Sequence, residues 1–418
     1  MDRIIFHIDA NSAFLSWQAA YDLQHGAALD IRDVPAVIGG SQSTRHGIVL
    51  AKSIKTKPFK IKTGEPIILA KQKCPNLLVV PSNYFVYAQS SKAMFDIFRE
   101  YTPRLQVFSI DEGFLDFTGM ESLYGNDPVE AATIIKNRIM KELGFTVSVG
   151  ISSNKLLAKM ASEFKKPDGV STCYPNEIKE KIWPLPVREL YGVGRATEEK
   201  LLRYDIRTIG DIASTPVQFL KHLFKSYGTI LWNFANGIED SEIHQGLAVG
   251  NHHTIKGMGN SCTSNFDITN KGNAYLTLLS LIETVSMRLR FGGFSARVIS
   301  VYIRTSDLSG YGHQRKLLSP VDTVEAIYEV VKLLFDESWK KEPIRGLGVR
   351  ATELYSEYIQ MSIFEKDWSK QRQVNRIIDQ IRVKYGSDSI IRGAFLHSGI
   401  NHMQGGMGGD YPGMSSTL

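Results

Sequence analysis

The order of strand and helix patterns in the first 170 residues is the feature that most constrains how this chain folds. A strand candidate at 3–9 precedes a helical pattern at 13–23, and a second helical pattern covers 84–101. The run "VFSIDEGFLDF" at 107–117 then predicts two strands around an acidic turn, and a helix and a further strand follow it. With the irregular segment 30–80 set aside, the order is strand, helix, two strands, helix and strand.

This order is that of the split βαβ, or ferredoxin-like, arrangement of α+β domains. In that arrangement the first two strands run in the same direction, because right-handed connections join the elements. Their C-terminal ends therefore lie at the same edge of the sheet. Asp9 ends the first strand, and Asp111 and Glu112 form the turn after the second. We expect these three acids to be neighbours in the folded chain.

A second segment, 250–356, shows the same order of strand and helix patterns, which predicts a second domain of similar plan. Between the two domains, residues 171–236 are expected to form short helices and 237–249 a linker. The chain from 357 to 418 is expected to be a helical tail with a glycine-rich end.

The composition is that of an ordinary globular protein. Of the 418 residues, 43% are hydrophobic and 22% are charged, which suits a soluble chain of about two to four domains. No apolar stretch is long enough to span a bilayer, and the N-terminus lacks a signal-peptide pattern. Three widely spaced cysteines without zinc-finger spacing indicate free thiols in a reducing cytoplasm. We therefore expect a cytoplasmic protein without a membrane partner, whose net charge of +6 permits binding to nucleic acid.

Three carboxylates at one sheet edge repel one another unless a cation lies between them. Two divalent ions about 3.5–4 Å apart can activate an attacking oxygen and stabilise a leaving phosphate oxygen, and Mg²⁺ suits this role. The sequence thus predicts a catalytic site in which Asp9 and Asp111 bridge two Mg²⁺ ions and Glu112 completes the ligand set. The backbone carbonyl of Ala10 is a further candidate ligand. The alternative is a hairpin whose solvated tip is acidic.

Three motifs resemble those of a known family. "IDANSAF" at 8–14, "SIDEGFLDFTG" at 109–119 and "VGISSNKLLAKMASEFKKPDG" at 149–169 are similar to the catalytic motifs of bacterial Y-family, DinB/UmuC-like translesion DNA polymerases. The likeness extends over about the first 355 residues. The resemblance implies a ferredoxin-like palm with inserted fingers, a thumb and a second ferredoxin-like domain, the little finger. The implied spans are palm 1–29 and 67–170, fingers 30–66, thumb 171–236, linker 237–249, little finger 250–356 and tail 357–418.

The resemblance also implies residues that bind the incoming nucleotide. Phe14 corresponds to the aromatic residue that excludes a ribose 2′-hydroxyl, although a phenylalanine in this helix can also be an ordinary core residue. In "AKSIKTKPFKIKTGEP" at 51–66, Lys57 stands where the family usually has arginine, and Ile54 replaces the usual tyrosine. Lys57 can still neutralise triphosphate charge, as a point charge. Lys159 matches the lysine of the family that reaches the triphosphate.

Two further features predict contacts with DNA. "LPVRELYGVGRATEEKLLRYDI" at 185–206 resembles a helix-hairpin-helix motif, in which Gly192 and Gly194 permit a tight turn that exposes N–H groups to a phosphate. The alternative is a plain helical turn. In the second domain, strand 297–304 places Arg304 on a polar face, which either lies against DNA phosphates or is an ordinary solvated face.

The tail contains a candidate peptide for binding a sliding clamp. "QMSIF" at 360–364 resembles the short clamp-binding peptide of bacterial polymerases. Its glutamine and its apolar anchors are Gln360, Met361, Ile363 and Phe364. The alternative is that these side chains pack on the preceding domain.

The sequence therefore predicts a template-directed, low-fidelity DNA polymerase that uses two Mg²⁺ ions, deoxynucleoside triphosphates (dNTPs) and primer–template DNA. A non-catalytic scaffold that binds DNA and a clamp is a second hypothesis, which the substitutions at Ile54 and Lys57 allow. A nucleotide cyclase is a third, because similar sheets place acids around two metals.

Overall fold

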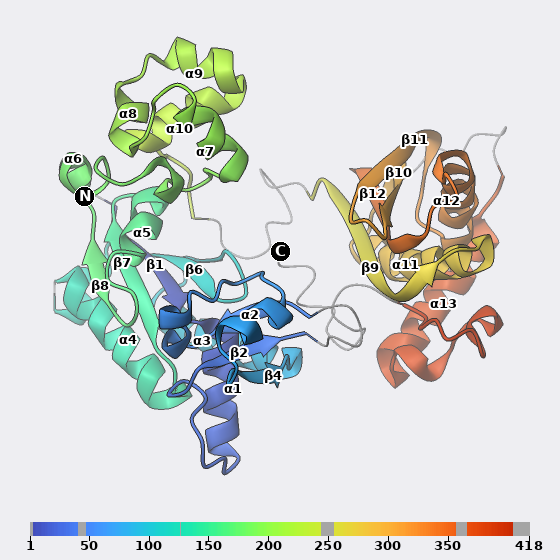
Figure 1. Cartoon of the computed structure of the whole chain (residues 1–418), viewed down its shortest axis with the longest axis horizontal. Helices are drawn as coiled ribbons and strands as arrows, with labels where there is room; N and C mark the ends of the chain where they lie inside the picture. Colours follow the sequence, from blue (N-terminus) through green and yellow to red (C-terminus); the bar gives the residue numbers. More distant parts are fainter. Residues whose placement is uncertain (1–2, 41–46, 126, 244–254, 357–365, 404–418) are drawn as a thin grey trace. The chain divides into compact units, whose positions relative to one another are not determined.

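The computed structural model of the chain (Figure 1) describes residues 3–40, 47–125, 127–243, 255–356 and 366–403. These residues form two compact units. The first holds most of the chain up to residue 248, and the second holds most of 249–416.

A five-stranded sheet in the order β5-β6-β1-β7-β8 forms the centre of the first unit. β1 is antiparallel to both β6 and β7, and β5 is antiparallel to β6, so β1 and β5 run in the same direction. This is the ferredoxin-like order that the sequence predicted, with β8 as an additional edge strand. The strands are β1 (Ile5–Ala10), β5 (Leu105–Val107), β6 (Glu112–Asp116), β7 (Val147–Ser152) and β8 (Val170–Thr172).

Side chains of β1 alternate between the two faces of this sheet. Phe6 and Ile8 belong to the main core, together with residues of α1 (Ala13–Gln24), α3 (Tyr84–Tyr101) and α4 (Pro128–Leu143). Ile5, by contrast, clusters with Ala158 of α5 (Lys155–Ser162). The alternation therefore directs the polar residues of β1 towards α5.

Helix α5 packs closely on β7 because Gly150 lacks a side chain. A Cβ atom at Gly150 would lie 1.9 Å from the carbonyl oxygen of Ala158. Asn154 caps the helix, since its Oδ1 accepts a hydrogen bond from the backbone N–H of Leu157 at 2.9 Å. The helix is therefore shorter than the predicted span 152–164.

A small three-stranded sheet in the order β3-β2-β4 lies within the first unit. Its strands are β2 (Ala36–Gly39), β3 (Val49–Lys52) and β4 (Leu78–Pro81), and α2 (Ile67–Lys73) accompanies them. Its core is a separate cluster that includes Val37, Val49 and Ile67. Residues 67–81, which the resemblance places in the palm, form α2 and β4. β4 pairs in this small sheet, and α2 packs in its core.

Short helices follow the central sheet, as the sequence predicted for 171–236. They are α6 (Ile178–Lys181), α7 (Arg195–Leu202), α8 (Ile209–Ser214), α9 (Val217–Phe224) and α10 (Ser226–Ala235). The segment directly before the Gly-Val-Gly turn is only a short 3₁₀ helix, Val187–Glu189. These helices share one apolar core with α5.

The second unit shows the predicted order of elements. They are β9 (Gly257–Ile268), α11 (Lys271–Phe291), β10 (Ser295–Thr305), β11 (Gly310–Val321), α12 (Val324–Ser338) and β12 (Ile344–Tyr355). The sheet order is β11-β10-β12-β9, and all neighbours are antiparallel. Its first strand lies at an edge, whereas the first strand of the other sheet is central. The two domains thus share their element order but differ in strand order.

The tail helix α13 (Ser369–Tyr385) packs on the second unit through buried charges. Arg290 Nε lies 2.6 Å from Asp379 Oδ2, and Arg382 Nη2 lies 2.6 Å from Glu283 Oε2. These four side chains are between 1% and 5% exposed, so the ion pairs are shielded from water.

Residues that follow α13 complete the core of the second unit. Phe395 and Ile400 belong to the same apolar cluster as the side chains of α11 and α12. Part of the predicted tail is therefore a component of this domain rather than an appended segment. Throughout the described ranges, every helix is too short or too polar to cross a bilayer.

Candidate active site

The sheet brings the three predicted acids to one edge. Asp9 lies directly opposite Glu112 in the register of β1 and β6. The backbone N–H of Ala10 donates to the carbonyl oxygen of Asp111 at 2.9 Å. Glu112 is the first residue of β6 rather than part of the turn. The proximity that the topology predicted is therefore present in the structure.

Asp9 carries a negative charge that its surroundings only partly stabilise. The pKa of Asp9 is raised to about 6, mainly by burial; Lys166 opposes this increase, and the charges of Asp111 and Glu112 add to it. Lys166 Nζ lies 2.9 Å from Asp9 Oδ1 and 2.6 Å from Glu163 Oε1. Because Lys166 is shared between Asp9 and Glu163, a divalent cation would stabilise the Asp9 carboxylate more strongly than this lysine does.

Glu112 is held from two sides. His7 Nε2 lies 2.9 Å from Glu112 Oε2, and Lys159 Nζ binds the same oxygen. Burial would raise the pKa of Glu112, but the hydrogen bonds from His7 and Lys159 and the charge of Lys159 hold the pKa at about 2. Glu112 is therefore ionised throughout the neutral range.

Asp111 is partly exposed and is oriented by its own turn. The hydroxyl of Ser109 donates to Asp111 Oδ1 at 2.5 Å. The backbone N–H of Asp111 in turn donates to Ser109 Oγ at 3.3 Å. The turn thus presents this carboxylate at the sheet edge without any cationic partner among the hydrogen bonds and ion pairs of the described residues.

The donor set of this edge fits a hard divalent cation. Three carboxylates offer oxygen ligands of the kind that Mg²⁺ prefers. Within the described ranges, no three carboxylate, imidazole or thiol groups already converge on a common point as metal ligands. Lys159 and Lys166 instead neutralise two of the acids. Burial raises the pKa of Asp9 even though Lys166 opposes the increase.

A cavity of about 380 Å³ opens beside the acids. Asp9 lines it together with Lys57, which lies on the 3₁₀ helix Ile54–Phe59. Lys166 and Arg32 also line the cavity, whereas Lys159 does not. The remaining lining residues are Asn11, Ser12, Leu15, Ser16, Ser53, Ile54, Thr146, Pro167 and Asp168. The cavity thus combines one of the three acids with three basic side chains.

Our sequence reasoning did not select Lys166 or Arg32. Lys166 lies in the segment "KKPDG" at 165–169, which is the last part of the third motif. The signal that could have found it is its place after α5, on the connection that returns to the sheet edge through β8. Arg32 offers no such signal, because its side chain pairs with Asp30 at 2.7 Å and bonds to the carbonyl of Gly144 at 2.7 Å.

Lys159 lies between Glu112 and two aromatic rings. Besides Glu112, its ammonium lies 5.0 Å from the centre of the Phe108 ring and 5.7 Å from that of Tyr191. These are cation–π distances. Its role in nucleotide binding remains a prediction.

Phe14 belongs to an aromatic cluster on α1 and α3. Its ring stacks on Tyr87 with centroids 4.4 Å apart and an interplanar angle of 6°, and it meets Tyr84 edge-on at 5.8 Å. Phe14 is only partly buried, so part of a ring that stacks on Tyr87 is accessible to solvent.

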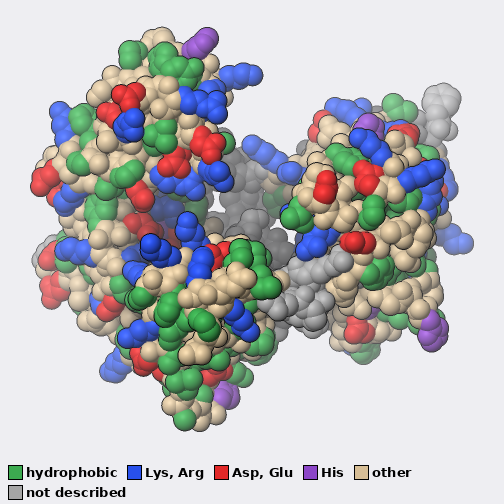
Figure 2. Space-filling view, viewed as in Figure 1, with side chains coloured by type: hydrophobic (Ala, Val, Ile, Leu, Met, Phe, Trp, Pro, Cys, Tyr) green, Lys and Arg blue, Asp and Glu red, His purple; other side chains and the backbone are tan. Residues whose placement is uncertain are grey.

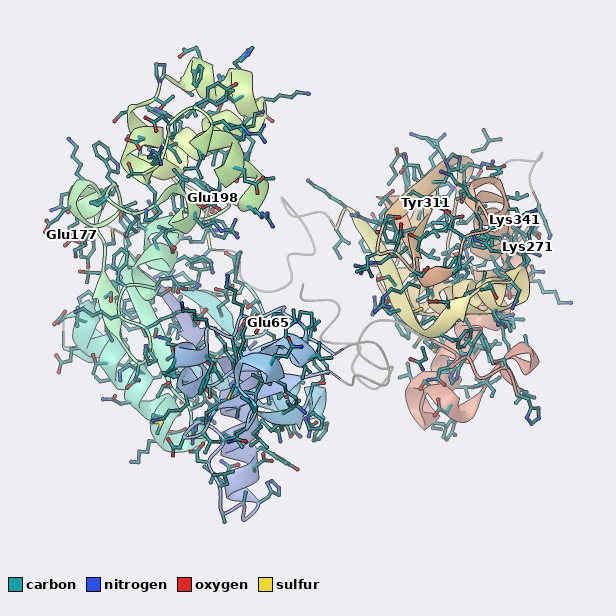
Figure 3. All side chains as sticks on the ribbon, viewed as in Figure 1. Glu65, Glu177, Glu198, Lys271, Tyr311 and Lys341 are labelled. Carbon is teal, nitrogen blue, oxygen red and sulfur yellow. The ribbon has the colours of Figure 1, made fainter. Side chains whose placement is uncertain are left out.

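The predicted DNA-binding residues lie on exposed turns and strands. Gly192 has φ of +90°, and its carbonyl accepts a hydrogen bond from the hydroxyl of Tyr227 at 2.7 Å. Gly194 precedes α7, whose first turn has no side-chain cap. Glu198 of α7, labelled in Figure 3, lies 3.7 Å from Arg188.

Basic side chains gather on the first unit between the short helices α7–α10 and the small sheet (Figure 2). In the second unit, Arg304 is exposed on β10, whereas Val301 and Ile303 of the same strand are buried. Arg304 therefore lies on the exposed face of the strand, as the sequence predicted. The candidate clamp peptide, residues 360–364, lies outside the described residues.

Models of known families match most of this chain. The model described as the impB/mucB/samB family matches residues 8–163, and its C-terminal domain model matches 255–363. A model described as the IMS family HHH motif matches 175–206. These three ranges contain both ferredoxin-like segments and the Gly-Val-Gly turn.

Curated relatives match over almost the full length. A DNA polymerase IV from Clostridium acetobutylicum is 45% identical over 398 residues, which are 95% of this chain and 99% of the relative. DNA polymerase IV 1 of Bacillus subtilis is 36% identical over 94% of this chain and 93% of the relative.

Solved structures share the fold at low sequence identity. A Y-family DNA polymerase chimera of Dbh and Dpo4 is 21% identical, with a TM-score of 0.71, and covers 85% of this chain and 100% of its own. DinB from Sulfolobus solfataricus is 22% identical, with a TM-score of 0.55, over 84% of this chain and 98% of its own.

Proposed function

Because the chain belongs to the impB/mucB/samB family and is a DNA-directed DNA polymerase of the Y family, we propose that it copies damaged template DNA at low fidelity. In this proposal it transfers nucleotides from dNTPs to a primer 3′-hydroxyl with two Mg²⁺ ions. The observation that carries the proposal is the meeting of Asp9, Asp111 and Glu112 beside a basic cavity.

The three acids and the carbonyl of Ala10 would hold the metal ions. When bound, these ions increase the nucleophilicity of the attacking hydroxyl and stabilise charge on the leaving oxygen. Asp9 fits this role because its carboxylate, which is disfavoured by burial without a strong cation, lines the cavity. Glu112 fits it because its low pKa keeps the carboxylate ionised.

The cavity suits a nucleoside triphosphate. Lys57 and Lys166 place positive charge beside Asp9, where the phosphates of a bound nucleotide would need neutralisation. Ile54, also on the lining, offers no hydrogen bond to phosphate. Phe14, held by Tyr87, would exclude a ribose 2′-hydroxyl by its bulk.

The DNA and the clamp would bind elsewhere on the chain. The turn at Gly192 and Gly194 would bind a backbone phosphate without reading sequence, and Arg304 would contact phosphates from the exposed face of β10. Residues 360–364 would bind the sliding clamp. The curated polymerase names do not favour the non-catalytic scaffold.

Primer extension tests this proposal. The wild-type protein should extend a primer with dNTPs and Mg²⁺ on undamaged and on abasic template, and Asp111→Ala should lose at least about 10²-fold in rate. Asp96→Ala removes an exposed acid of α3 and is the matched control. Unchanged extension by Asp111→Ala would contradict the metal role. DNA binding without any extension would favour the scaffold.

A further inference from the structure

His7 is a buried residue that the motif analysis left without a role. It lies on β1, two residues before Asp9, and its side chain is fully buried. The ring is held between two polar partners. Nε2 lies 2.9 Å from Glu112 Oε2, and Nδ1 lies 2.9 Å from the hydroxyl oxygen of Ser162 on α5. The ring also packs against Phe114 at 4.8 Å.

The contacts of the ring decide where its proton resides. A carboxylate only accepts hydrogen bonds, whereas each imidazole nitrogen can carry a proton. Glu112 is ionised, so an unprotonated Nε2 would place its lone pair against the Glu112 Oε2 lone pairs and would repel them. The proton is therefore on Nε2, which donates to Glu112. Nδ1 lies 2.9 Å from Ser162 Oγ, and the Ser162 hydroxyl donates to the Lys159 carbonyl oxygen at 2.7 Å.

We propose that His7 is a positioning residue that fixes the Glu112 carboxylate through its Nε2–H and so prepares this acid to bind a metal ion. The inference rests on the proposed role of Glu112 as a metal ligand. The other partner of Glu112 is Lys159, whose flexible chain ends in a point charge with three equivalent donors. The imidazole instead offers one donor in a fixed direction, because its strand, Ser162 and Phe114 all confine the ring.

Hydrogen bonds to metal ligands of this kind typically change metal affinity or activity by about 10–100-fold when they are removed. A buried histidine can also serve only to fill the core. The two roles predict different results. If His7 only fills the core, losing the contact with Glu112 and losing the contact with Ser162 should have the same effect on metal binding.

Two amide substitutions separate the sides. In His7→Gln, the longer amide reaches the position of Nε2 and keeps a donor to Glu112. In His7→Asn, the shorter amide reaches only the position of Nδ1 and keeps the contact with Ser162. Both variants bury one amide at the same site, which makes them a matched pair. Ser162→Ala keeps the Nε2–H and removes the other contact, and His222→Asn on the exposed surface of α9 is the control.

Each variant is measured for primer extension, for the KM of dNTP, and for Mn²⁺ binding without nucleotide by the electron paramagnetic resonance signal of free Mn²⁺. We expect His7→Asn to lower kcat and Mn²⁺ affinity by about 10–100-fold with little change in KM. His7→Gln and Ser162→Ala should stay within about threefold of the wild type in both, far from the 10–100-fold loss. Equal losses in His7→Asn and His7→Gln, or no loss in either, would overturn the inference.

Glu112→Gln separates this inference from the proposed function. If Glu112→Gln is inactive and His7→Asn is active, the role of His7 is wrong and that of Glu112 stands. If Glu112→Gln retains wild-type extension and Mn²⁺ binding, both roles are wrong. If His7→Asn fails to fold while His7→Gln and Ser162→Ala fold with normal Mn²⁺ affinity, the Nε2 side still carries the effect, as proposed.

Discussion

Replacing Asp9 with asparagine should make the metal-free protein more stable while abolishing its activity. The pKa of Asp9 rises from 3.8 to about 6 on folding, chiefly because the carboxylate is buried. A raised carboxyl pKa means that the folded state prefers the protonated form. Stability is therefore lost as the pH rises from below 3.8 to above 6, by about 1.4 kcal/mol for each pH unit between these values. The total is about 3 kcal/mol at pH 8, of which about half is already present at pH 5.

Other groups hide this effect in the wild-type protein. The pKa of His7 is lowered from 6.5 to about 4, so the stability contributed by His7 increases as the pH rises through that interval. This increase opposes the contribution of Asp9. His7 is present in both proteins, so its contribution cancels when the free energy of unfolding of the wild type is subtracted from that of Asp9→Asn. The difference therefore reports on Asp9. Asp9→Asn should be more stable by about 1.5 kcal/mol at pH 5 and about 3 kcal/mol at pH 8.

Urea unfolding between pH 5 and pH 8, without divalent cations, measures this difference in free energy. Asp96→Asn, on the exposed surface of α3, should change stability by no more than about 0.5 kcal/mol. Added Mg²⁺ should stabilise the wild type and narrow its gap to Asp9→Asn, because the variant loses a ligand. An Asp9→Asn protein that is no more stable than the wild type above pH 6 would refute the electrostatic reasoning.

Three further predictions concern the tail, the sugar and the triphosphate. Asp379→Ala removes the partner of the buried Arg290 and should destabilise the second unit by about 3–5 kcal/mol. Glu329→Ala, whose partner is exposed, should cost only about 0–1 kcal/mol. Thermal unfolding measures both changes. Phe14→Ala should raise incorporation of ribonucleotides relative to deoxynucleotides by at least about tenfold in kcat/KM, measured by single-nucleotide extension. Lys166→Ala should raise the KM of dNTP by about tenfold and more than Lys159→Ala does, since only Lys166 lines the cavity.

Each of these predictions has an outcome that contradicts it. Equal destabilisation by Asp379→Ala and Glu329→Ala would mean that burial does not decide the strength of these ion pairs. An unchanged sugar preference in Phe14→Ala would remove its proposed role. If the KM of dNTP increases more in Lys159→Ala than in Lys166→Ala, then Lys159, the lysine implied by the motif resemblance, is the one that binds the triphosphate.

Much of the fold could be predicted from local patterns. The helix at 84–101 coincides with α3, and the order of elements that predicted the ferredoxin-like sheet is present in both units. Local patterns succeed here because the periods of helices and strands follow from short-range backbone geometry. Topology then sufficed to predict that Asp9 would meet Asp111 and Glu112, because two strands that run in the same direction end at the same edge.

The docking of α13 could not be predicted in this way. Its inward residues are polar, and Asn375, Asp379 and Arg382 are buried while Ile377 and Val383 are exposed. Apolar periodicity therefore indicates the wrong face. Polar groups are tolerated inside because each has a partner on α11, α12 or the loop after α13, and these partners are remote in the sequence.

Local sequence thus specified the order of the main strands and helices in both units, and through topology which acids converge. Long-range packing specified their electrostatic state. The high pKa of Asp9, the low pKa of Glu112 and the low pKa of His7 all depend on burial and on charges that include those of α5 and the loop after it. Such interactions depend on distance in space and on exclusion of water, which the spacing of residues along the chain does not encode.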